Sequence, residues 1–179
     1  GGLKLMPDNH YYGCCACIGA AGAGIIPEIA ILNKKDGIVI NYYEKGFLNT
    51  SRDGFVNTMN ISAYSLVTIA KHAKDLMHDG GSIITLTYYG GAKYIPNYNL
   101  MGVAKAALEM TTKYLAEDLG RDGTRVNAIS AGPIKTLAAA GIGDFRFMLK
   151  WNEAHSPLKK NVSIDEVGNS GMYLLSDLS

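Results

Sequence analysis

Apolar residues return at every third or fourth position over long stretches of this chain, and these stretches alternate with short runs of β-branched residues. From Phe55 to Met77 the apolar spacing is that of one buried helix face. The segment 50–53 ahead of it offers a cap and a first-turn acid, and the glycine pair at 80–81 follows its end. The pattern predicts one long helix.

Short buried strands are expected at 36–40, 82–87 and 124–130, because each run is rich in β-branched residues. A second long helix is expected from Tyr98 to Leu119, and a capping box, Ser163 to Glu166, opens the last helix. Strands separated by helices of about 20 residues need crossover connections, so they pair in parallel. The pattern predicts an α/β fold with a doubly wound parallel sheet.

Composition limits the classes of function. The chain has 179 residues, of which 47% are hydrophobic and 18% charged, as in a soluble globular protein. Lysine plus arginine number 17 against 16 acids, a net charge of +1, so we expect no nucleic-acid or membrane partner. No apolar stretch approaches the ~20 residues of a membrane span. Without a supported secretory signal, we expect a cytoplasmic location.

All the cysteines lie within 14–17. They include a C-x-x-C spacing, which occurs in redox and zinc sites. Only His10 lies near as a further ligand, so small apolar residues in a buried strand are the simpler interpretation. We expect no metal site.

Chemistry is expected beyond the carboxyl ends of the strands, where ligands bind in such sheets. The strand that ends near Thr87 leads directly to Tyr98 and Lys105, which are seven residues apart. Seven residues make nearly two helical turns, so both side chains lie on one helix face. A neighbouring ammonium stabilises phenolate and makes a tyrosine a better proton donor. By itself the spacing favours an ordinary helix with a packed tyrosine and a solvated lysine, so the context decides.

The context is a resemblance. The segment 87–109 closely resembles the NADH-dependent bacterial enoyl-[acyl-carrier-protein] reductases, divergent members of the short-chain dehydrogenase/reductase superfamily. Their Tyr-x6-Lys pair with a second tyrosine ten residues earlier matches Tyr98, Lys105 and Tyr88. Ordinary members of the superfamily have Tyr-x3-Lys, whereas the fourth residue after Tyr98 is Gly102. The resemblance covers about 36–179 and implies a Rossmann-like fold.

The resemblance implies an oxidoreductase of fatty acid biosynthesis that reduces the trans-2 double bond of enoyl thioesters on acyl carrier protein. Its cofactor would be NADH, with NADPH left open, and its assembly a homotetramer. Tyr98 would donate a hydrogen bond to the thioester carbonyl, Lys105 would hold the cofactor ribose, and Tyr88 would shape acyl binding. The other residues implied at the cofactor are Ile134, Lys135, Thr136, Leu137 and Ala138. Those implied at the acyl chain are Met101, Ile142 and Phe145.

The sequence also departs from the family. The first 35 residues are too few for the two βα units, each of about 30 residues, that precede the strand at 36–40. Within 18–24 the glycines read G-x-x-G-x-G, one residue short of the superfamily's turn, and bulky tyrosines follow the strand at 42–43. We therefore divide the chain into an atypical segment, 1–35, and a catalytic portion, 36–179. We expect a sheet that is incomplete at the N-terminus and lacks the family's last strand.

Two functions stay open at this point. One is an enoyl-thioester reductase or a fragment of one. The other is a catalytically inactive homologue that acts only through oligomerisation, with the long helices 55–77 and 98–119 as its contact surface.

The departure over 1–35 generates a first prediction. Because that segment is too short for the units that hold the pyrophosphate, we expect the purified chain to bind NADH weakly or not at all. A thermal-shift titration or the change in NADH fluorescence measures this directly. Micromolar affinity would contradict the expectation.

Overall fold

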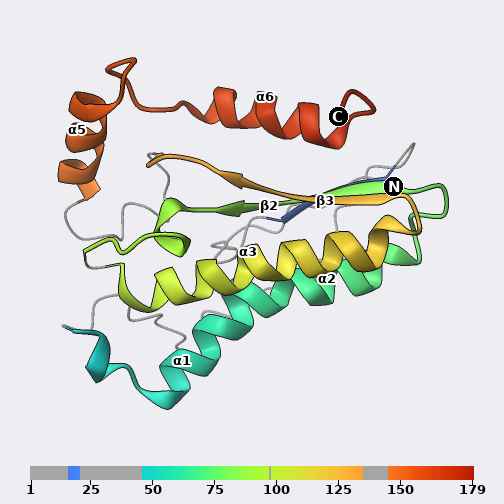
Figure 1. Cartoon of the computed structure of the whole chain (residues 1–179), viewed down its shortest axis with the longest axis horizontal. Coiled ribbons are helices and arrows are strands. Elements are labelled where there is room, and N and C mark those ends of the chain that lie inside the picture. The colour runs from blue at the N-terminus through green and yellow to red at the C-terminus, as the bar shows by residue number, and fades with distance from the viewer. Residues whose placement is uncertain (1–15, 21–45, 97, 135–144) are drawn as a thin grey trace, which may run out of the picture.

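A computed structural model of the chain describes residues 16–20, 46–96, 98–134 and 145–179 (Figure 1). In these residues a three-stranded sheet lies between helices, with α2 and α3 on one face and α6 on the other (Figure 1). This layering confirms the predicted α/β fold. The proposed division between 1–35 and 36–179 and the expected strand at 36–40 lie outside the described residues.

The central strands are β2 (Gly81–Thr87) and β3 (Thr124–Ser130), which pair in parallel as predicted. Their register sets Gly81 opposite Thr124 and Thr87 opposite Ser130, so both strands end at the same edge of the sheet. The crossover between them is α3 (Asn99–Gly120). Because β2 and β3 end level with each other, the residues that follow them share one edge.

The third strand, β1 (Ala16–Ala20), pairs antiparallel with the other side of β2. The sheet of the described residues is therefore mixed, because β1 lies in the segment 1–35, for which the sequence predicted no pairing. Ile18 to Ala20, the first part of the segment compared with a glycine-rich turn, belong to this strand. An open edge of β2 would leave a row of backbone groups unpaired, and a strand of either direction satisfies them.

The long helix predicted from Phe55 to Met77 is present but interrupted. It consists of α1 (Arg52–Met59), a π-helical turn η3 (Asn60–Tyr64) and α2 (Ser65–Lys74). A short 3-10 turn, η2 (Phe47–Asn49), precedes it, and the Ser51 hydroxyl caps α1 by accepting a hydrogen bond from the Gly54 amide at 3.1 Å. A π turn adds one residue to the helical repeat. A helix predicted from a regular apolar spacing of 3.6 residues does not reveal a π turn within it.

Helices α2 and α3 pack together and against the sheet (Figure 1). Leu66 of α2, Leu108 of α3 and Ile83 of β2 are completely buried where these layers meet. Ala70 and Ala73 keep the same face of α2 small. These buried aliphatic side chains fix the height of α3 against the sheet.

The opposite face of the sheet is covered by α6 (Ile164–Leu175). A Cβ placed on Gly171 would lie 3.3 Å from Cδ1 of Ile84, which is tighter than an ordinary van der Waals contact, so a glycine suits this close approach. The guanidinium of Arg125 donates to the carbonyl oxygens of Leu174 at 3.0 Å and Ser176 at 2.9 Å. These carbonyls at the end of α6 have no partner within the helix, and an arginine from β3 supplies it.

Helix α5 (Phe145–His155) lies beyond the carboxyl ends of β2 and β3 (Figure 1). The side chain of Asn161, in the connection from α5 to α6, donates to the Leu149 carbonyl oxygen at 3.1 Å. Its Oδ1 also accepts a hydrogen bond from the side-chain Nδ2 of Asn152 at 2.9 Å. Among the described helices, none has the length and apolar character needed to cross a membrane.

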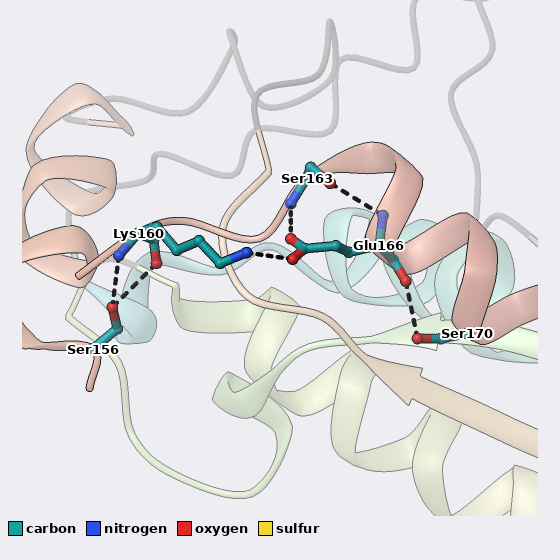
Figure 2. Close-up of polar contacts among 5 residues, drawn as sticks. All are labelled: Ser156, Lys160, Ser163, Glu166 and Ser170. Atoms are coloured by element: carbon teal, nitrogen blue, oxygen red, sulfur yellow. Dashed lines mark hydrogen bonds and ion pairs between the residues drawn. The ribbon is translucent and has the colours of Figure 1, made fainter. Parts of the chain in front are cut away.

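The predicted capping box opens α6 (Figure 2). Ser163 Oγ accepts from the Glu166 amide at 3.1 Å, and Glu166 Oε2 accepts from the Ser163 amide at 2.8 Å. The Lys160 ammonium binds the other carboxylate oxygen of Glu166. The hydrogen bond from Lys160, followed by that from the Ser163 backbone, holds the pKa of Glu166 below its usual value of 4.5.

This lowered pKa generates a prediction on acid stability. Because the pKa of Glu166 is lower in the folded protein than in the unfolded one, its contribution to stability is complete above about pH 4.5 and is lost as the pH falls through the folded-state pKa. We expect Glu166→Gln to be less stable than wild type at pH 7, and we expect this difference to be smaller at pH 3. The matched control is Asp165→Asn, which removes a charge from the same turn and none of the contacts in Figure 2. Urea unfolding at both pH values measures the difference; a gap that is the same at pH 3 would refute the prediction.

Candidate active site

The candidate site lies where β2 ends and α3 begins. β2 leads through Tyr88 into a 3-10 turn, η4 (Tyr89–Gly91), and a loop then reaches Tyr98, the N-cap residue of α3. The chain therefore turns back over the end of its own strand. In parallel sheets this edge is the usual place for ligands, because connections of alternating direction leave a crevice there.

One face of α3 meets the end of β2 at successive positions. The Lys105 ammonium donates to the Leu86 carbonyl oxygen at 2.8 Å. One turn further along α3, Glu109 Oε1 accepts a hydrogen bond from Thr87 Oγ1 at 2.7 Å. At the start of the helix, the rings of Tyr98 and Tyr88 meet edge to face, with centroids 5.0 Å apart and planes at 69°. The face of α3 that carries Tyr98 and Lys105 is thus the face that contacts the carboxyl end of β2.

The ring of Tyr98 is held by glycines. A Cβ on Gly90 would lie 2.4 Å from Cδ1 of Tyr98, so any side chain there would displace the ring. A Cβ on Gly102 would lie 2.9 Å from the Gly90 carbonyl oxygen, so this glycine lets η4 rest directly on α3. Asn99 has a φ of 40°, in the left-handed region. Strained backbone of this kind persists where the surrounding contacts enforce it, often at functional sites.

Tyr88 precedes Tyr98 in the chain and lies directly after β2. Its ring is half-buried, and desolvation by burial raises the pKa of Tyr88 above its usual value of 10. The group therefore stays a neutral phenol at physiological pH, able to donate a hydrogen bond. Its edge-to-face contact orients the ring of Tyr98 at the same time.

An open depression of about 470 Å³ lies beside Tyr98. The residues around it come from η2, from η4 with the loop after it, and from the first turns of α3. They include Phe47, Tyr94, Ile95 and Val103, so much of the wall is apolar, with Lys93 as a cation. Its volume is within the range of small-molecule sites.

The sequence-predicted residues fall into three groups. Tyr88, Tyr98 and Lys105 come together at the end of β2, as the contacts above show. Met101 is half-buried on α3, and the Ser62 hydroxyl points to its sulfur at 4.0 Å, so this sulfur faces η3. Ile134 is half-buried just after β3. The rest lie outside the description, which covers only the backbone of Phe145 and none of Lys135, Thr136, Leu137, Ala138 and Ile142.

Sequence reasoning missed Thr87 and Glu109 as parts of this site. A signal was available: Glu109 follows Lys105 by four residues, so it lies on the same helix face. For Thr87 the sequence indicates only the end of a strand. That its hydroxyl reaches α3 depends on how the helix lies across the sheet.

The fold and this edge define the class. Parallel strands crossed over by α3, with a tyrosine and a lysine from that helix at their carboxyl ends, place the protein among the Rossmann-fold proteins. The family model described as "Enoyl-(Acyl carrier protein) reductase" matches residues 18–179. The chain belongs to this family.

Individual relatives agree. Enoyl-[acyl-carrier-protein] reductase [NADH] 1 of Rhizobium meliloti (strain 1021) is 68% identical over 133 residues, which are 74% of this chain and 49% of the relative. The Bacillus cereus enoyl-[acyl-carrier-protein] reductase [NADH] is 50% identical over 156 residues, 87% of this chain and 59% of that protein. The chain spans about half the length of the curated relatives it matches.

Solved structures show the same likeness. The Bacillus cereus enoyl-acyl carrier protein reductase with NADP+ and indole naphthyridinone has a TM-score of 0.76 at 52% identity, over 78% of this chain and 55% of that one. The Anaplasma phagocytophilum enzyme in complex with NAD has a TM-score of 0.70 at 51% identity, over 75% and 49% of the two chains. These likenesses confirm the resemblance found in the sequence.

The contact between Gly90 and Tyr98 generates a prediction. We expect Gly90→Ala to push the Tyr98 ring away from Tyr88 and to lower the free energy of unfolding by about 1–3 kcal/mol, the usual cost of overpacking. Gly120→Ala is the control, because apart from its chain neighbours and the backbone of its own helix no atom lies within 4 Å of a Cβ at that position. Urea unfolding and the near-ultraviolet tyrosine dichroism report both effects. A tyrosine signal unchanged by Gly90→Ala would contradict the prediction.

Proposed function

We propose that this chain carries the catalytic half of an enoyl-[acyl-carrier-protein] reductase, which reduces the trans-2 double bond of enoyl thioesters with NADH in cytoplasmic fatty acid biosynthesis. The observation that carries the proposal is the meeting of Tyr98, Tyr88 and Lys105 at the carboxyl end of β2. Membership of the reductase family supports it, as do the NADH-dependent relatives. The acyl carrier protein would present the substrate.

The residues present fit a nicotinamide nucleotide. The Lys105 ammonium has three donor hydrogens, and within the described part of the chain its hydrogen-bond acceptor is the Leu86 carbonyl oxygen. The remaining donors suit the paired hydroxyls of a ribose. Ser130, at the end of β3, is exposed and level with Thr87, so solvent reaches this edge of the sheet on the β3 side. Ile134 and the segment 135–138, which follow β3, are proposed to line the nicotinamide and pyrophosphate.

The chain's own residues would handle the charge that develops on the substrate. When bound, a nicotinamide would supply a hydride for C3 of the enoyl group. The electron pair of the double bond then moves onto the thioester oxygen, giving an enolate that takes up a proton at C2. The Tyr98 phenol would donate a hydrogen bond to that oxygen, and the Lys105 ammonium would add positive potential. Tyr88 would hold the ring of Tyr98 by its edge and stay neutral.

The acyl chain needs an apolar wall. Met101, Ile142 and Phe145 are proposed to provide it, by the resemblance of their positions to the family. The sulfur of Met101 already contacts Ser62 of η3, so this wall would include the π turn beside α3.

The assembly is proposed to be a homotetramer. Large apolar side chains are exposed on α1, η3 and α3, among them Tyr64 at 61% and Tyr114 at 70% exposure. Such residues are costly to leave in water and favour contact with a second copy. An inactive homologue that acts only through oligomerisation is not supported, because the similar proteins are named as reductases.

The catalytic roles generate a prediction. In the full-length protein, we expect Tyr98→Phe and Lys105→Ala each to lower kcat/KM for reduction of crotonyl thioesters by about 10²–10³-fold, as loss of one donor at a developing oxyanion does. Lys113→Ala is the matched control, because Lys113 is exposed on the same helix. NADH oxidation followed by absorbance measures the rates, and thermal melting shows that the variants fold. Unchanged activity in Lys105→Ala would remove the role given to that residue.

A further inference from the structure

We propose that Glu109 is a positioning residue for Lys105. Its carboxylate holds Thr87, and this bond fixes α3 on the end of β2 at the place where the Lys105 ammonium reaches the Leu86 carbonyl oxygen. The consequence for the reaction rests on the proposed function, in which Lys105 holds the cofactor. The structural role, in which the bond between Glu109 and Thr87 sets the position of Lys105, does not depend on the proposed function.

Two hydrogen bonds join the same pair of elements side by side. Lys105 and Glu109 are four residues apart on α3, and their partners Leu86 and Thr87 are consecutive in β2. One turn of an α-helix rises about 5.4 Å. The Thr87 bond therefore anchors the helix one turn beyond the lysine, and the lysine bond cannot keep its length if this anchor is lost and α3 moves along the strand.

The Thr87 hydroxyl makes this anchor strong. Thr87 is 8% exposed, and a hydroxyl so deeply buried needs a partner, which Glu109 Oε1 supplies at 2.7 Å. A hydrogen bond to a carboxylate is shorter and stronger than one between neutral groups. Removing either member would leave the other polar group partly buried without its bond.

The turn η4 restricts the position of the Glu109 side chain. A Cβ on Gly91 would lie 2.9 Å from the Lys105 carbonyl carbon and 3.0 Å from Glu109 Oε1. The backbone of η4 thus covers the same helical turn that carries both side chains. The Glu109 carboxylate is confined between η4 and the end of β2, so its bond to Thr87 is held in one geometry.

The first experiment needs no enzymatic activity. The folded chain is treated with a low dose of acetic anhydride, and the acetylation of each lysine is measured by peptide mass spectrometry. We expect labelling of Lys105 to rise roughly fivefold to tenfold in Thr87→Val and Glu109→Ala, in line with loss of one charge-assisted bond. Lys113, exposed on the same helix, is the internal control and should not change.

Conservative variants separate the hydrogen bond from general damage. Thr87→Ser keeps the hydroxyl and Glu109→Gln keeps an acceptor oxygen, so both should protect Lys105 as wild type does. Glu117→Ala is the matched loss of a carboxylate on the exposed face of α3, and it should leave Lys105 protected. The double variant Thr87→Val/Glu109→Ala should label no more than either single one, because both remove the same bond.

The second experiment reads the functional consequence in the full-length protein. If Lys105 is misplaced, we expect KM for NADH to rise roughly tenfold in Thr87→Val and Glu109→Ala, with a smaller change in KM for the enoyl thioester and rescue in Thr87→Ser. A full-length protein without reductase activity would refute the proposed function and leave the labelling result standing. Unchanged Lys105 labelling in Thr87→Val and Glu109→Ala, or an equal rise in Glu117→Ala, would overturn the positioning role.

Discussion

The attachment of α3 to the carboxyl end of β2 is the constraint on which the rest of the site depends. Hydrophobic packing of Leu66, Leu108 and Ile83 sets the distance between the layers but does little to fix how far the helix slides along the strand. Hydrogen bonds, which are directional, fix the position of α3 along β2. The contacts of Lys105 with the Leu86 carbonyl and of Glu109 with the Thr87 hydroxyl are short and lie in one row, so they define both the position and the orientation of α3.

The glycines of this site are as important as the side chains that form hydrogen bonds. η4 can fold back onto α3 because Gly90, Gly91 and Gly102 leave room for backbone and ring atoms that any Cβ would contact at 3 Å or less. This close approach places the ring of Tyr98 against Tyr88, and the strained backbone of Asn99 is held at the same point. The aromatic pair is therefore ordered before any ligand arrives, which lowers the cost of binding one.

On the opposite face of the sheet, α6 is held by a different set of contacts. α6 approaches the strands closely at Gly171, and Arg125 of β3 binds the carbonyl oxygens at the helix end. A capping box with Lys160 secures its start. The bonds from Arg125 and the close approach at Gly171 attach α6 to the strands, so the sheet has a packed layer on each face. The candidate site at the strand ends then lies on a rigid support, as a catalytic geometry requires.

The sequence by itself determined the local elements: β2, β3, α3, the capping box of α6 and the shared face of Tyr98 and Lys105, since each depends on residues close together in the chain. Its motifs also identified the family. Only the tertiary structure decided the π turn within the long helix, the antiparallel direction of β1 and the partners of Thr87 and Glu109. The π turn adds one residue to a helical turn at little cost in free energy. A free sheet edge can pair with a strand of either direction, so the direction of β1 is not set locally. The bond between Thr87 and Glu109 joins residues 22 apart and depends on how α3 lies on the sheet. The spacing of apolar residues along the chain therefore predicts neither the π turn, nor the direction of β1, nor the bond between Thr87 and Glu109.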